Sequence, residues 1–272
     1  MKKIIIFCTL FTSIIQQKVI AQEYDNNDKS YFKVATRYYS DVVYSGRRDS
    51  IQVPYIEPSL SYFHESGFFI TTALAFNPIS KFSEPFDRFT IDAGYEFSIT
   101  KNIEAGIYYS KYYYNANSQA ISAELKSDLG IDLNFTKNNW HLRSGAYLFF
   151  SDLTDDFTYL SLSYSQEVKI GNMKLFILPK ISSNQGTQKL FINRKTKKLT
   201  NTSASTGTGF SVLDYEAGVE FNLDKPKWGI TLEPYYAVPV NPGLLSSNRI
   251  KGDKYEKLSN TFYTQFSIYF KF

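Results

Sequence analysis

Polar and apolar residues alternate with a period of two through most of this chain. In the C-terminal segment Phe262, Phe266 and Phe270 fall on one face. Gln265 and Lys271 fall on the opposite face. Successive side chains of a β-strand point to opposite faces, whereas apolar residues on a helix recur every three to four positions. The chain is therefore predicted to be all-β, with strands that have one apolar and one polar face.

The alternating segments are separated by residues that favour turns, and no domain boundary interrupts them. We predict about twelve strands, an even number as expected for a bacterial barrel with both ends on one side of the membrane. They are expected at 31–40, 52–63, 68–77, 86–99, 103–114, 121–136, 140–150, 157–170, 173–183, 210–223, 228–238 and 261–272.

The connections between these segments alternate in length. Short turns are expected at 64–67, 100–102, 137–139, 171–172 and 224–227. Longer connections are expected at 41–51, 184–209 and 239–260. Short turns at one end and long loops at the other are typical of outer-membrane barrels.

A soluble β-sandwich would show the same alternation. Trp140 and Trp228, however, each follow a short turn on the apolar face, as in the aromatic girdle of a membrane barrel. The chain ends on Phe272, and this ending resembles the C-terminal signal that outer-membrane barrels present to their assembly machinery. We therefore predict a transmembrane antiparallel up-and-down β-barrel at 31–272, in contact with outer-membrane lipid and lipopolysaccharide.

Residues 1–21 have the features of a cleavable signal peptide, followed by a short periplasmic tail at 22–30. Lys2 and Lys3 precede an apolar stretch that is too short to span a membrane. Removing 1–21 leaves the mature chain close to neutral and without cysteine, since Cys8 is the only one. Nucleic-acid binding and disulfides are therefore not expected.

If the apolar face meets lipid, the polar face lines the lumen. The charged residues predicted to line it are Arg37, Asp92, Glu96, Glu124, Asp132, Arg143, Asp214, Glu216 and Glu220. They would line a passive, porin-like channel for small hydrophilic solutes, with the acidic excess favouring cations. Alternatively, they would pair across a closed lumen, leaving a structural or surface protein that acts through its external loops.

Two further candidates come from the connections. The basic residues Arg194, Lys195, Lys197 and Lys198 would either contact lipopolysaccharide phosphates or form a constriction, unless the loop is only solvated surface. His64 and Ser66 resemble the His-x-Ser pair of the outer-membrane phospholipases, but they fall in a short turn. A lipid hydrolase is thus the third hypothesis. No catalytic residue or cofactor is assigned. A transition-metal site is not expected, because the chain has only two histidines and no cysteine after processing.

Two N-terminal segments resemble a family of small porins of the bacterial outer membrane, the TorF-like family. Residues 40–47, Ser-Asp-Val-Val-Tyr-Ser-Gly-Arg, are similar to the opening motif of that family, although Ser45 stands where the family usually has arginine. Residues 59–69 are similar to its second hairpin, in which a turn glycine, here Gly67, is followed by aromatics. The resemblance covers about the first quarter of the chain and implies a small general porin.

Overall fold

The computed structural model describes residues 29–48, 52–79, 85–118, 120, 122–171, 173–189, 209–240 and 259–272. The predicted signal peptide and most of the predicted tail lie outside these ranges, so both remain predictions. In the part of the chain that is described, no helix has the length and hydropathy needed to cross a membrane.

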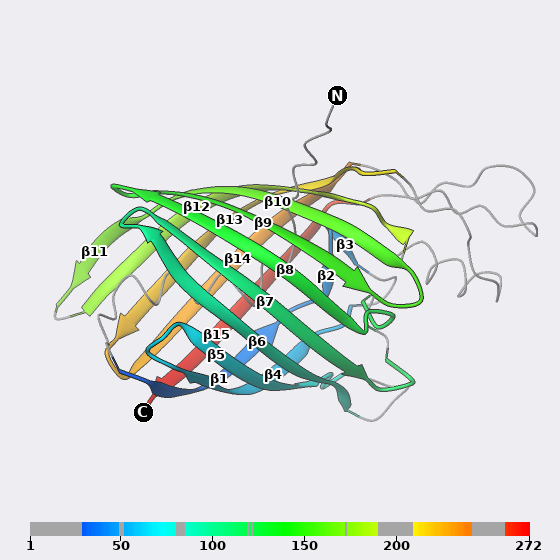
Figure 1. Cartoon of the computed structure of the whole chain (residues 1–272), viewed down its shortest axis with the longest axis horizontal. Coiled ribbons are helices and arrows are strands. Elements are labelled where there is room, and N and C mark those ends of the chain that lie inside the picture. The colour runs from blue at the N-terminus through cyan, green and yellow to red at the C-terminus, as the bar shows by residue number, and fades with distance from the viewer. Residues whose placement is uncertain are drawn as a thin grey trace, which may run out of the picture.

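The strands form one closed antiparallel barrel of twelve strands, which confirms the predicted fold class (Figure 1). Neighbours in sequence pair with each other, β1 pairs with both β4 and β15, and β10 closes the barrel against β12. The barrel strands are β1 (Tyr31–Tyr39), β4 (Tyr55–Phe63), β5 (Phe68–Phe76), β6 (Phe86–Thr100), β7 (Ile103–Tyr114), β8 (Ser127–Lys137), β9 (Trp140–Phe150), β10 (Thr154–Tyr164), β12 (Met173–Gly186), β13 (Ser211–Lys225), β14 (Trp228–Pro239) and β15 (Thr261–Lys271).

Three short strands complete the structure. β11 (Gln166–Ile170) continues β10 after Ser165 and pairs with β12. β2 (Val43–Tyr44) and β3 (Arg47–Arg48) form a separate two-stranded hairpin between β1 and β4. The single strand predicted at 157–170 is therefore two strands, and it begins earlier, at Thr154.

The predicted start of the strand at 121–136 is wrong. β8 begins at Ser127, because the chain turns just before it. The backbone N–H of Ala123 donates to the carbonyl of Ala120 (3.1 Å), and that of Leu125 donates to the carbonyl of Ser122 (2.9 Å). These hydrogen bonds within the turn take the place of the strand pairing that the alternation predicted. Leu125, at the end of the turn, is buried.

The two ends of the barrel differ in their connections, as predicted. Tight turns join β4 to β5, β6 to β7, β8 to β9, β11 to β12 and β13 to β14, and the C-terminus lies at the same end (Figure 1). Asn138 and Gly171 adopt positive φ in two of these turns, as tight turns often require. We call this the short-turn end and the opposite one the long-connection end.

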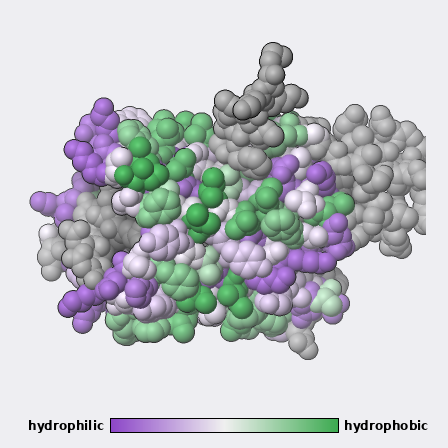
Figure 2. Space-filling model, in the orientation of Figure 1, coloured by the Kyte–Doolittle hydropathy of each residue, from purple (hydrophilic) through white to green (hydrophobic). Residues whose placement is uncertain are grey.

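The outer face of the barrel is apolar. Its large side chains are exposed, including Phe32 on β1, Leu133 on β8 and Phe266 on β15. Figure 2 shows hydrophobic residues spread over the barrel wall, with the hydrophilic ones mostly toward its two ends. At the short-turn end the exposed ring of Trp140 lies 5.0 Å from that of Tyr164. A closed barrel with this outer face is located in the bacterial outer membrane.

The inner face combines glycines with aromatic rings from the neighbouring strand. At five positions a Cβ on the glycine would collide with a ring of its cross-strand partner, so the missing side chain makes room for that ring. These pairs are Gly94 with Phe69, Gly130 with Tyr147, Gly145 with Tyr159, Gly218 with Tyr235, and Gly229 with Tyr269. The rings therefore lie close against the wall, and the hydroxyl groups of Tyr147, Tyr235 and Tyr269 reach acidic residues along it.

Candidate functional site

Eight of the nine predicted lumen residues lie on barrel strands with their side chains buried or nearly so. They are Arg37 on β1, Asp92 and Glu96 on β6, Asp132 on β8, Arg143 on β9, and Asp214, Glu216 and Glu220 on β13. Their neighbours in sequence, such as Ile131, Leu133 and Tyr215, are exposed on the apolar face. Because side chains alternate along a strand, the buried set points into the barrel.

Glu124 is the exception. It lies in the turn that precedes β8 instead of on a strand. The prediction extended the alternation of β8 back to residue 121, and the turn at 122–124 breaks the register on which that assignment depended. Glu124 is therefore at the long-connection end of the barrel.

Acidic side chains outnumber basic ones among the buried residues of the inner face. The acids are Glu57, Asp87, Asp92, Glu96, Asp128, Asp132, Asp155, Asp214, Glu216, Glu220 and Glu233. The buried bases are Lys33, Arg88, Arg143, Lys180 and Lys271. The described part of the lumen therefore has a negative formal charge.

Tyrosines hold many of these carboxylates in place. The hydroxyl of Tyr112 donates to Asp128 (2.6 Å) and that of Tyr147 to Asp132 (2.6 Å). In the same way Tyr108 donates to Glu96 (3.1 Å). Hydrogen bonds from a neutral hydroxyl satisfy a buried carboxylate without cancelling its charge. The sequence analysis assigned no such role to tyrosine, although the signal was available, since each of these tyrosines falls on the polar face of its strand.

One cluster joins three strands around Glu57. The guanidinium of Arg88 forms an ion pair with Glu57, and that of Arg37 lies 3.8 Å from the same carboxylate. The hydroxyl of Tyr39 also donates to Glu57 (3.4 Å). Arg88 was missed in the sequence analysis because the clear alternation of β6 begins one residue later, at Phe89.

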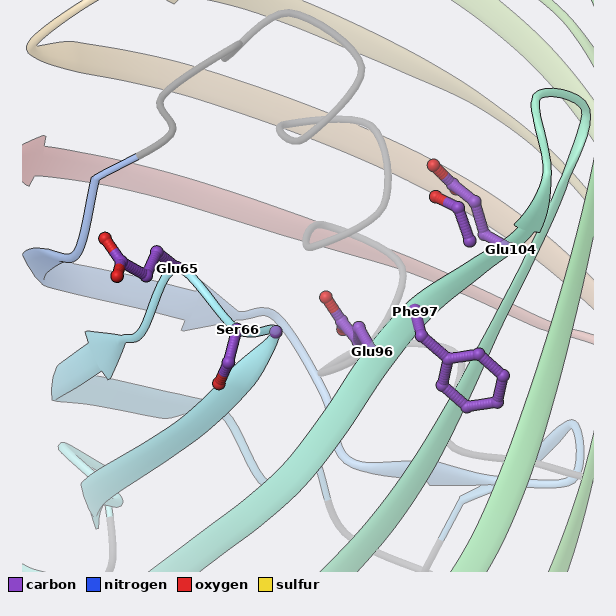
Figure 3. A pocket seen from close by; sticks show the side chains of 7 residues that line it. Glu65, Ser66, Glu96, Phe97 and Glu104 are labelled. Carbon is purple, nitrogen blue, oxygen red and sulfur yellow. The ribbon is translucent and has the colours of Figure 1, made fainter.

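Two cavities of very different volume border residues of the inner face. A cavity of about 20 Å³ lies beside Lys33, Arg37, Glu57 and Asp92, which is room for about one water molecule. A much larger cavity of about 310 Å³ opens at the short-turn end. Figure 3 shows Glu65, Glu96 and Glu104 around this cavity, with Phe97 turned away from it. We call the larger cavity the acidic vestibule.

His64 and Ser66 lie together in the turn between β4 and β5. Nδ1 of His64 is 2.8 Å from the hydroxyl oxygen of Ser66, and the backbone N–H of Ser66 donates to the same nitrogen (3.1 Å). Both side chains are exposed at the short-turn end. The pair thus stabilises a turn, at the end opposite to the one where the outer leaflet is expected.

Arg194, Lys195, Lys197 and Lys198 lie outside the described residues, so the loop hypotheses remain predictions. Among the residues that the structure describes, no group of three or more His, Cys, Asp or Glu side chains is arranged to hold a metal ion.

No protein-family model and no curated protein matches this chain. Its fold does match solved structures. A KdgM porin is 7% identical and has a TM-score of 0.51, covering 88% of this chain and 99% of its own. This chain therefore has the fold of an outer-membrane β-barrel. LpxR from Salmonella typhimurium matches with the same identity and coverage, 7%, 88% and 99%, at a TM-score of 0.50. A NanC porin is 7% identical over 88% of this chain and 98% of its own, with a TM-score of 0.46.

At 7% identity these likenesses show the fold alone. The KdgM porin and LpxR share that fold, so the fold does not distinguish between their activities. What this barrel does therefore depends on the residues of its own lumen.

Proposed function

We propose that this porin-like barrel is a passive channel for small hydrophilic solutes and that it passes cations and neutral solutes in preference to anions. The observation that carries the proposal is the excess of buried acids over buried bases on the inner face. Catalysis is not part of the proposal. The resemblance of residues 40–47 and 59–69 to the TorF-like porins supports the same function.

The physical reason is electrostatic. A solute that enters the lumen loses part of its hydration shell, and the cavity beside Arg37 and Glu57 holds only about one water molecule. Fixed carboxylates replace part of that shell for a cation and repel an anion, and charges act more strongly in a narrow, low-dielectric passage than in bulk water. The acidic vestibule would concentrate cations at one entrance.

A second function is favoured by the packing of the lumen. Arg88, Glu57, Lys180 and Glu233 are buried and form ion pairs inside the barrel. Such pairs would act as an internal clamp in a closed barrel that works through its external loops. The two functions differ in one measurable property, which is ion conduction.

Planar-bilayer recording tests the proposal. The purified barrel, first shown to be folded by its heat-dependent shift on a gel, should give discrete current steps. In a salt gradient the reversal potential should indicate cation preference. Glu216→Gln and Glu96→Gln should reduce that preference, because each removes a carboxylate from the inner face. Asp152→Asn is the matched control, since Asp152 is exposed and pairs with Lys126 at 2.7 Å outside the lumen.

Two results would count against the channel. A folded protein that gives no current steps would favour the closed barrel instead. Anion preference in the unmodified protein would show that the acidic excess does not control permeation.

We also propose two contacts outside the lumen. Phe272, exposed at the end of the chain, would present the last strand to the barrel-assembly machinery. Deleting Phe272 should lower the yield of folded barrel in the outer membrane while leaving refolding in detergent unchanged. The basic residues 194–198 would contact lipopolysaccharide phosphates.

A further inference from the structure

The hairpin of β2 and β3 packs against the inside of the barrel at the long-connection end. Three consecutive side chains contact three different sectors of the wall. Val42 packs against a cluster that includes Tyr39 and Tyr55, on β1 and β4. Val43 packs against Tyr235 and Tyr263, on β14 and β15.

Tyr44, the third of these side chains, contacts the third sector, formed by β9 and β10. The ring of Tyr44 lies 6.5 Å from that of Phe149 on β9 and 6.1 Å from that of Phe157 on β10. These two phenylalanines are almost completely buried, although they face the lumen. A segment whose neighbouring residues contact β1 and β4, β14 and β15, and β9 and β10 must cross the lumen.

The tip of the hairpin is fitted closely to β13. Gly46 has φ of +70°, a conformation that L side chains rarely adopt. A Cβ at Gly46 would also lie 2.8 Å from Oδ2 of Asp214. Asp214 itself is fully buried beneath the hairpin. Both the backbone conformation and the available space therefore require glycine at this position.

The base of the hairpin is fixed by hydrogen bonds on both sides. The backbone N–H of Val53 donates to Oδ1 of Asp41 (2.9 Å), and Nε2 of Gln52 donates to the carbonyl of Ser40 (2.7 Å). The hydroxyl of Ser40 accepts from the backbone N–H of Thr264 on β15 (2.8 Å). These bonds connect both ends of the 40–53 segment with each other and with the barrel wall.

We propose that residues 42–48, which we call the lumen hairpin, are the constriction that limits passage through the long-connection half of the barrel. This inference rests on the proposed channel function for its effect on conduction, but its occluding position can be tested independently. The lumen hairpin lies between three wall sectors, so solutes must pass through the space that it leaves beside them. Asp214, beneath Gly46, supplies a carboxylate at the level of the hairpin tip.

The conduction test compares the full chain with two changes. In the first, residues 42–48 are replaced by a Gly-Ser segment of equal length, and conductance should rise several-fold. In the second, Gly46→Ala should displace the tip from Asp214 and raise conductance less. Gly171→Ala is the matched control, because Gly171 also has positive φ (+60°) but has no atom within 4 Å of an added Cβ. Unchanged conductance in both hairpin variants would overturn the proposal.

A labelling test does not depend on conduction. Asp214→Cys is placed in a chain that also carries Cys8→Ser, and the folded protein is treated with a membrane-impermeant maleimide. The thiol should react slowly with the lumen hairpin present and much faster once residues 42–48 are replaced. Equal rates would overturn the occluding position. Faster labelling together with silent bilayers would instead support the lumen hairpin and refute the channel.

Discussion

The two ends of the lumen are built in opposite ways. At the short-turn end, Glu65, Glu96 and Glu104 surround an open cavity of about 310 Å³. At the long-connection end, the lumen hairpin instead lies inside the barrel, with Tyr44 packed against the buried rings of Phe149 and Phe157. Both ends belong to one barrel with one strand count, so barrel geometry alone does not decide how wide the lumen is.

The difference follows from the length of the connections. The short turns, such as the one around Asn138, only reverse the chain and cannot reach the barrel axis. The connection from Ser40 to Pro54 is long enough to fold inward, and it carries Val42, Val43 and Tyr44 to bury. Apolar residues in a long connection of a barrel therefore indicate that the connection packs inside.

The largest expected effect concerns the buried ion pairs toward the long-connection end. Glu57→Gln should lower the free energy of unfolding by about 3–5 kcal/mol, because it leaves two guanidinium groups buried without their carboxylate. Glu167→Gln, in the exposed pair with Lys174 toward the short-turn end, should cost about 0–1 kcal/mol. Urea unfolding in lipid vesicles, followed by tryptophan fluorescence, measures both. Equal costs would remove the contrast between the two ends.

The next effect tests whether the apolar face of the strands meets lipid. The two ends of the lumen can be compared only if the opposite, polar face lines it. Ile131→Arg, near the middle of β8 on the outer face, should destabilise the barrel by about 2–4 kcal/mol, because lipid cannot solvate the charge. Ile131→Leu should cost less than about 1.5 kcal/mol. The same unfolding assay applies. A tolerated arginine would mean that Ile131 faces water.

A smaller effect tests the ring packing of the wall between the two ends. Gly130→Ala should destabilise the barrel by roughly 1–3 kcal/mol, because its Cβ meets the ring of Tyr147. In a Tyr147→Ala background the same change should cost much less. A double-mutant cycle should therefore give a coupling energy of roughly 0.5–3 kcal/mol. Additive costs would show that the glycine is not there to make room for the ring.

The smallest effect concerns the acidic vestibule. Glu104→Gln should change stability by less than about 0.5 kcal/mol, since the side chain borders an open cavity. It should still reduce cation preference slightly, as judged by the reversal potential. A shift as large as that of Glu216→Gln would indicate that the vestibule, and not the long-connection half, controls selectivity.

The sequence predicted most of the fold because the environment of a membrane barrel repeats. Each strand has lipid on one side and the lumen on the other, so β6, β13 and β15 show their two faces directly in their alternation. The prediction was wrong at 122–126, where alternation continues into a turn. Alternation of polar and apolar residues is a property of the segment alone. It does not show whether a neighbouring strand is present to pair with that segment.

The sequence by itself therefore determined the strands, the lipid-facing side and the location of this protein. Only the tertiary structure brought Arg88 to Glu57, Tyr147 over Gly130 and Tyr44 into the lumen. The face of the strand on which a side chain lies is a local property, since it depends only on the position of the residue along its own strand. Which side chains meet across the lumen depends on strand register, on closure of the barrel and on the path of a long connection. These are fixed only when distant segments pack together.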